Sequence, residues 1–127
     1  MQEKFYLTTP IFYVNAPPHM GHAYAVVLTD IIARYKRFLG ENTYFLTGTD
    51  EHGAKIVRAS AAAAKEPRVF VDEMAQEFKK LFSMLNISHD QFIRTSDEKN
   101  HWPGAIKLWK KMLEKGDLSK LLYRGLY

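Results

Sequence analysis

Apolar residues in the first part of the chain follow first the spacing of a strand and then that of a helix. Residues 5–14 are β-branched and aromatic on both faces, which predicts a buried parallel strand broken at Pro10. From Met20 to Leu39 apolar side chains recur about every 3.6 positions, which predicts a helix that stops at Gly40. Its inward face would carry Ala23, Val26, Val27, Ile31 and Phe38.

A second strand is predicted over residues 43–47, so that residues 5–47 form the strand–helix–strand unit of a parallel sheet. Helices are then predicted from residue 53 to about 65 and over residues 67–85, where Pro67 suits a first turn. A short strand follows at residues 91–94. These patterns indicate an α/β fold.

The last part of the chain predicts one more helix, which Ser96 would cap and Gly116 would end. Residues 122–127 look like the start of a further strand. The inward face of that helix would carry Trp102, Ile106, Trp109 and Leu113.

Composition narrows the class of protein. The chain has 127 residues, of which 46% are hydrophobic and 25% charged, values that exclude a disordered or collagen-like chain. It has no cysteine, which excludes a disulfide scaffold, a thiolate nucleophile and a cysteine zinc site within it. The net charge of +4 is mild, and residues 97–127 supply most of it. A solvated helix face is the favoured interpretation of those charges, and an RNA-facing surface is the alternative.

Targeting and membrane signals are missing from the sequence. The first residues contain no apolar run of the kind found in signal peptides, and no uncharged stretch approaches the length that crosses a bilayer. We therefore expect a cytoplasmic protein without a membrane partner.

Histidines gather in two segments that follow predicted strands, at the edge where ligands bind in open α/β sheets. In the first, His19 and His22 flank Gly21 where a helix begins. A helix N-terminus with two imidazoles on one side suits a triphosphate and the charge that develops in phosphoryl or nucleotidyl transfer. Ordinary loop residues and a two-histidine metal site are the alternatives.

In the second segment, residues 47–53, two glycines bracket two carboxylates and a histidine, which is more than a turn requires. Asp50 is placed to pair with a ligand ammonium. Glu51 has either a functional role or a plainer one, as a solvated residue or the cap of the next helix. His52 is equally open.

These segments carry a resemblance to a known family. The residues Pro18-His19-Met20-Gly21-His22 resemble the HIGH signature of class I aminoacyl-tRNA synthetases. Residues 9–15 (TPIFYVN) and 47–53 (TGTDEHG) are similar to those of methionyl-tRNA synthetases. Residues 90–95 (DQFIRT) and the stretch from Trp109 to Asp117 also fit, so that the resemblance covers essentially the whole chain.

The resemblance implies a Rossmann-like (HUP-type) parallel sheet with flanking helices, of which residues 1–117 would form the first half. Residues 118–127 would begin the connective insertion that carries a zinc knuckle. The implied activity is that of a methionine–tRNA ligase, which joins L-methionine to ATP, accompanied by Mg²⁺, as methionyl-adenylate. It then transfers the methionyl group to tRNA(Met).

The resemblance also implies roles for single residues. ATP would be bound by His19, Gly21 and His22, with the two histidines acting in catalysis. Methionine would be bound by Ile11, Phe12, Tyr13 and Asp50. Three more residues match the motifs without an assigned role: Asn15, Glu51 and His52. No residue is assigned to a metal.

Parts of the family pattern are missing, namely the KMSKS signature and the cysteines of the zinc knuckle. We therefore expect a piece of a longer synthetase that is inactive alone, whose parent enzyme could still bind zinc. Two alternatives remain: a small nucleotidyltransferase with an H-x-G-H loop, or a non-catalytic module that binds tRNA or a protein. Oligomeric state stays open.

Overall fold

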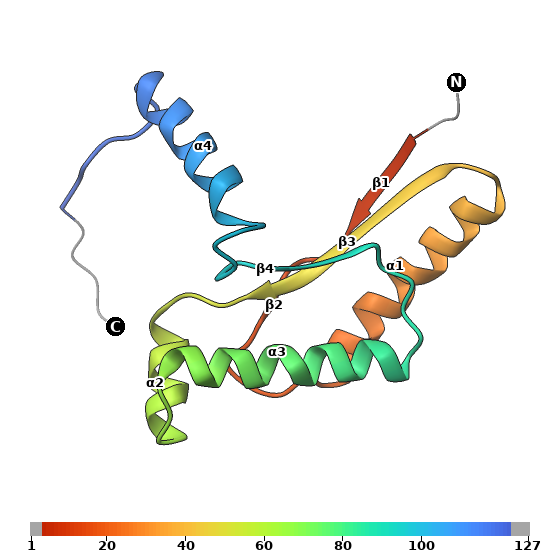
Figure 1. Cartoon of the computed structure of the whole chain (residues 1–127), viewed down its shortest axis with the longest axis horizontal. Coiled ribbons are helices and arrows are strands. Elements are labelled where there is room, and N and C mark those ends of the chain that lie inside the picture. Colours follow the sequence, from red (N-terminus) through yellow and green to blue (C-terminus); the bar gives the residue numbers. More distant parts are fainter. Residues whose placement is uncertain (1–3, 123–127) are drawn as a thin grey trace. The chain divides into compact units, whose positions relative to one another are not determined.

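A computed structural model describes residues 4–122, which form two compact units that divide between Ser96 and Asp97 (Figure 1). The first unit contains four strands, β1 (Lys4–Thr8), β2 (Phe12–Tyr13), β3 (Asn42–Asp50) and β4 (Gln91–Arg94). Its helices are α1 (Met20–Phe38), α2 (Ala54–Ala62) and α3 (Pro67–Met84). The second unit contains α4 (Trp102–Glu114).

The sheet is parallel throughout, and β3 is its central strand. Leu46 pairs with both Thr8 and Gln91, and Thr49 pairs with both Phe12 and Arg94. Because a strand residue has only two neighbouring strands, β4 lies on the side of β3 opposite β1 and β2. The predicted α/β class with a parallel sheet and flanking helices is confirmed.

The single strand predicted over residues 5–14 is two short strands with a bulge between them. Four steps along the chain from Thr8 to Phe12 face only three steps of β3, from Leu46 to Thr49. Pro10 lies in this bulge, where its missing N–H leaves no ladder hydrogen bond unmade.

Strand β3 runs three residues beyond the predicted end at residue 47, so that Thr47–Asp50 is strand and not loop. Its threonines Thr47 and Thr49 are completely buried. Gly48 has to be glycine, because a Cβ there would lie 2.0 Å from the carbonyl oxygen of Ile93 on β4. Glycine, threonine and aspartate are common in turns. Here they form the end of a strand, because β4 lies so close to β3 at Gly48 that only glycine fits between them.

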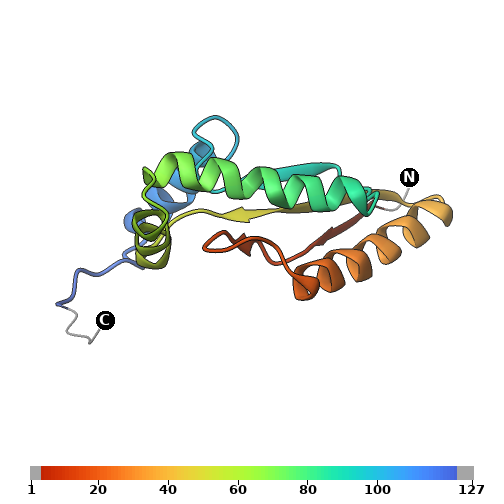
Figure 2. The same cartoon turned by 90° about the horizontal axis from the view of Figure 1, so that it is seen from below.

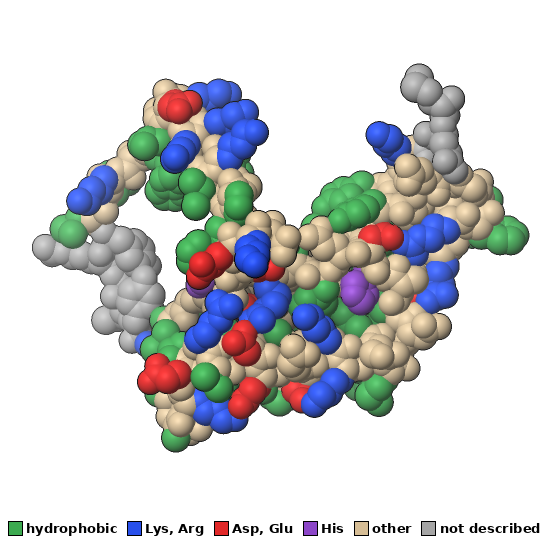
Figure 3. Space-filling model, in the orientation of Figure 1, with side chains coloured by type: hydrophobic (Ala, Val, Ile, Leu, Met, Phe, Trp, Pro, Cys, Tyr) green, Lys and Arg blue, Asp and Glu red, His purple; other side chains and the backbone are tan. Residues whose placement is uncertain are grey.

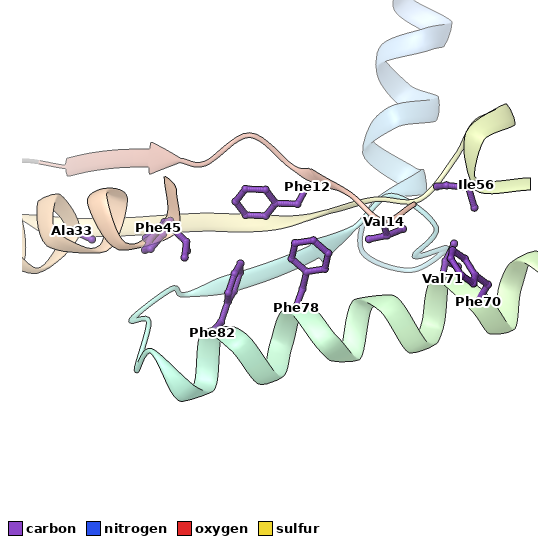
Figure 4. Close-up of a cluster of buried hydrophobic side chains, with 10 residues drawn as sticks. Phe12, Val14, Ala33, Phe45, Ile56, Phe70, Val71, Phe78 and Phe82 are labelled. Atoms are coloured by element: carbon purple, nitrogen blue, oxygen red, sulfur yellow. The ribbon is translucent and has the colours of Figure 1, made fainter. Parts of the chain in front are cut away.

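One face of the sheet carries the hydrophobic core. Phe78 and Phe82 of α3 point toward Phe12 of β2, with ring centroids 5.6 and 6.0 Å from that of Phe12 (Figure 4). Figure 2 shows α3 running lengthwise along the sheet. On the opposite face of β1 and β3, Tyr6 and Tyr44 stack on each other and remain exposed.

The predicted helices from Met20, from residue 53 and from Pro67 are confirmed, but the predicted inward face of α1 is partly wrong. Val26 is buried, whereas Ile31 and Phe38 are 57% and 87% exposed. The buried stripe passes instead through Asp30 and Ala33. Asp30 accepts hydrogen bonds from Arg34 (2.6 Å) and from the backbone (2.7 Å) and hydroxyl (2.5 Å) of Ser88. Burial raises the pKa of Asp30, but these hydrogen bonds outweigh it and hold the pKa below its usual value.

The second unit departs further from the sequence prediction. Ser96 does not cap α4, which begins six residues later at Trp102, and no side chain of this helix is buried. The four residues expected to face inward are all exposed instead. Figure 3 shows Lys and Arg side chains gathered along α4. Leu122 is not in a strand, and residues 123–127 lie outside the described residues. Within residues 4–122, no helix is long and apolar enough to cross a membrane.

Candidate functional site

The first histidine segment forms the N-terminal turn of α1. His19 is the N-cap residue, and its Nδ1 accepts a hydrogen bond from the backbone N–H of Gly21 (3.1 Å). In return, Nδ1 of His22 accepts from the backbone N–H of His19 (3.0 Å), which completes a capping box made of histidines. A Cβ on Gly21 would lie 2.9 Å from Cε1 of His19, so that any other residue there would force the His19 ring to shift.

The hydrogen bonds of the two rings determine which nitrogen carries the proton. Since each Nδ1 accepts from a backbone N–H, each neutral ring carries its proton on Nε2 and can donate it to a ligand. The ring centroids of His19 and His22 are only 3.9 Å apart. The pair therefore offers two donors side by side at a helix N-terminus, where the helix dipole favours an anion.

His22 is the more enclosed of the two histidines. Its ring packs edge-on against Phe12 and Phe78, with centroid distances of 5.2 and 5.0 Å. Burial, and to a lesser extent the charge of neighbouring His19, lower the pKa of His22 below its ordinary value of 6.5. A neutral ring at neutral pH is what the capping box needs, because a protonated Nδ1 cannot accept a hydrogen bond.

The second segment begins at the last residue of β3. Asp50 pairs with Tyr13 across the sheet, which brings the ends of β2 and β3 together. An oxygen of the Asp50 carboxylate accepts a hydrogen bond from the hydroxyl of Thr95 (3.4 Å). The Tyr13 hydroxyl lies against Gly53, where a Cβ would come within 2.8 Å of it, and Gly53 has a φ of +118° that favours glycine.

Glu51 is neither solvated nor a helix cap, which corrects the plainer interpretation of the sequence. Its side chain is completely buried, and both its oxygens accept from the guanidinium of Arg94 (2.7 and 2.9 Å). The hydroxyl groups of Thr49 (2.6 Å) and Ser96 also donate to it. Arg94 further contacts Asp72 of α3 at 2.5 Å. Hydrogen bonding to Glu51 raises the pKa of Arg94, although burial opposes the shift.

The structure places the other candidate residues at different depths. Phe12 is buried in the core, where its ring supports His22. Ile11 and Asn15 are exposed in the segments that follow Pro10 and β2. His52 is exposed, with Nε2 3.3 Å from the carbonyl oxygen of Thr95.

Sequence reasoning missed the residues that hold the second segment. Arg94 is the last residue of β4 and Thr95 follows it, whereas Asp72 belongs to α3, far away in sequence. An arginine directly after the apolar pair Phe92-Ile93 of a strand was a usable signal, because such a cation usually has a buried partner. The identity of that partner required the tertiary structure.

No metal centre is built by this part of the chain. Among residues 4–122 there is no group of three or more His, Asp or Glu side chains that could hold a metal ion. Without cysteine the sequence supplies no thiolate for a zinc knuckle, so that the residues present do not fit that metal.

Comparison with known proteins identifies related sequences and structures. The family described as tRNA synthetases class I (M) matches residues 5–127. The methionine–tRNA ligase of Thermotoga maritima is 52% identical over 124 residues, which are 98% of this chain and 20% of that protein. The methionine–tRNA ligase of Rickettsia prowazekii is 45% identical over 127 residues, 100% of this chain and 25% of that protein.

A crystal structure of Mycobacterium tuberculosis methionyl-tRNA synthetase bound by methionyl-adenylate has a similar fold. Its TM-score is 0.87 at 44% identity, over 90% of this chain and 22% of that chain. This chain thus spans about a fifth to a quarter of the length of the relatives it matches.

Proposed function

Because the chain belongs to the class I tRNA synthetase family (M), we propose that it contributes the ATP- and methionine-binding residues of a methionine–tRNA ligase. The relatives with the same motifs are methionine–tRNA ligases, and one related structure holds methionyl-adenylate. The reaction has two steps, activation of L-methionine by ATP and transfer of the methionyl group to tRNA(Met). ATP is a substrate here, and Mg²⁺ accompanies its phosphates.

In the first step the carboxylate of methionine attacks the α-phosphorus of ATP, and pyrophosphate leaves as methionyl-adenylate forms. His19 and His22 donate from Nε2 to the phosphate oxygens, and the N-terminus of α1 adds its partial positive charge. Negative charge that builds up on the oxygens during the attack is stabilised there. No covalent bond to the protein is required.

Asp50 is the residue proposed to bind the ammonium group of methionine. Its carboxylate is half-buried at the sheet edge, and no cation among residues 4–122 forms an ion pair with it. The neighbouring Glu51, by contrast, is already neutralised by Arg94. This contrast between adjacent carboxylates is the observation that carries the proposal, because only Asp50 has charge left for a ligand. Tyr13 beside it supplies an aromatic wall, a favourable surface for a thioether.

A chimera tests this proposal, in which the matched 124-residue segment of the Thermotoga maritima ligase is replaced by this chain. Methionine-dependent exchange of pyrophosphate into ATP is measured. In this chimera Asp50→Ala should raise the KM for methionine about 100-fold and leave the KM for ATP nearly unchanged. His22→Asn should mainly lower kcat, because its contact is made chiefly in the transition state.

The matched control is Asp117→Asn, which removes an exposed carboxylate of the second unit and should change neither constant. An unchanged KM for methionine in Asp50→Ala would exclude the assignment. The chain by itself should show no exchange, because the KMSKS lysine is not in its sequence. Binding of tRNA(Met) and a cytoplasmic location belong to the same proposal.

A further inference from the structure

We propose that Thr95 is the positioning residue that aims the Asp50 carboxylate at the ammonium group of methionine. This inference rests on the proposed function and deepens it. Thr95 follows the last residue of β4 and is buried. It lies outside the motifs around His19 and Asp50.

Thr95 bonds to three consecutive residues of the second segment. Its hydroxyl accepts from the backbone N–H of Glu51 (2.8 Å) and donates to the carboxylate of Asp50 (3.4 Å). Its carbonyl oxygen lies 3.3 Å from Nε2 of His52. Its own N–H donates to the carbonyl oxygen of Thr49 (3.1 Å), which extends the pairing of β4 with β3 by one residue. One side chain and its peptide groups thus hold the loop in one conformation.

The chemistry of the hydroxyl suits this position. A hydroxyl can accept one hydrogen bond and donate another at the same time, whereas an aliphatic side chain of the same shape can do neither. The Thr95 hydroxyl accepts from the N–H of Glu51 and donates its proton to the carboxylate of Asp50. A neutral donor orients a carboxylate without cancelling its charge, so that Asp50 remains available to a cation.

Arg94 and Thr95 therefore act differently on two adjacent carboxylates. Arg94 draws Glu51 into the interior and neutralises it with two hydrogen bonds. Thr95 holds Asp50 at the sheet edge with one bond from an uncharged group. These two adjacent residues at the end of β4 thus set which carboxylate is structural and which is presented to a ligand.

Substitution in the chimera tests the inference. Thr95→Val removes the hydroxyl and keeps the shape, and it should raise the KM for methionine about tenfold with the KM for ATP unchanged. Thr95→Ser keeps the hydroxyl and should restore the KM. The Ki of 4-(methylthio)butanoate, which is methionine without its ammonium group, should be the same in all three proteins. If Thr95 had a merely structural role, Thr95→Val would weaken the binding of the analogue and of methionine alike.

The matched control is Thr43→Val, which removes another buried threonine hydroxyl from the opposite end of β3 and should leave both KM values unchanged. If Thr95→Val does not fold, Thr95→Ala replaces it, because the smaller side chain leaves room for a water on the N–H of Glu51. An unchanged KM for methionine in a folded variant without the hydroxyl overturns the inference. A rise in the Ki of the analogue as large as the rise in the KM for methionine also overturns it. Loss of methionine binding in Asp50→Ala with no effect in Thr95→Val rejects only the inference. No effect in either rejects the proposed function.

Discussion

The two segments of the candidate site are held in different ways. In the first turn of α1, His19, Gly21 and His22 satisfy one another through hydrogen bonds that span no more than three residues. Around residues 50–52, all partners in side-chain hydrogen bonds except Thr49 come from positions 43 to 45 residues later in the chain. The histidine turn is therefore a local structure, whereas the carboxylate segment forms only when β4 has docked against β3.

This difference has a consequence for stability. Changes in the first segment should cost about as much as the loss of a helix cap, because water replaces the lost contacts. Changes in the second segment should cost more, because a buried charge loses its partner and water cannot reach it. Three experiments on the chain itself measure the contrast.

The largest effect is expected for Arg94→Met. Without the guanidinium, the completely buried carboxylate of Glu51 has no countercharge, and the free energy of unfolding should fall by about 3–5 kcal/mol. Urea denaturation followed by circular dichroism measures it. Arg58→Met, which removes an exposed arginine of α2, is the matched control and should have almost no effect. A loss below about 1 kcal/mol would show that the ion pair is solvated.

A smaller effect is expected for His19→Ala, which removes the N-cap acceptor of α1. The free energy of unfolding should fall by about 1 kcal/mol, measured in the same way. His19→Asn supplies another good N-cap acceptor and should restore it, while lacking the imidazole donor proposed for phosphate. If His19→Asn were as unstable as His19→Ala, the cap would not be the source of the loss.

The smallest effect is expected from pH. The pKa of His22 is lowered in the folded chain, so that the unfolded chain binds more protons as the pH falls below 6.5. The contribution of His22 to stability is thus complete above pH 6.5 and is lost as the pH falls toward its folded-state pKa. The loss should be less than about 1 kcal/mol, because the ring is partly solvated.

Denaturation of the chain and of His22→Asn at pH 7.5 and pH 5 isolates this contribution. The pKa of His89 is also lowered, mainly by burial, and its effect has the same sign in both proteins. The chain should lose more stability between the two pH values than the variant. Equal losses would show that His22 titrates normally.

Much of the fold was predictable because its elements carry local signals. The helix from Met20, the proline at the start of α3 and the strand at residues 91–94 all follow from spacing and capping preferences within a few residues. The inward face of α1 was not predictable in full. A polar residue is not expected at an interior position, but Asp30 occupies one. Its carboxylate can be buried because Ser88 and Arg34 donate hydrogen bonds to it.

The site divides in the same way. Sequence alone identified the histidine pair, its place at the start of a helix and the Asp50 segment, since each depends on residue types at short spacing. Their roles in binding remain predictions. The sequence could not show which of Asp50 and Glu51 is buried, because two adjacent carboxylates have the same local pattern. Only their contacts with Arg94 and Thr95 in the folded chain distinguish them.

What the sequence determined by itself is therefore the order and type of the elements and the chemistry available at the ends of β2 and β3. The tertiary structure decided how far β3 extends, which carboxylate is buried and which side chains of α1 point inward. The physical reason is that capping and periodicity act between near neighbours along the chain. Burial of a charge depends instead on groups that only the folded chain brings together.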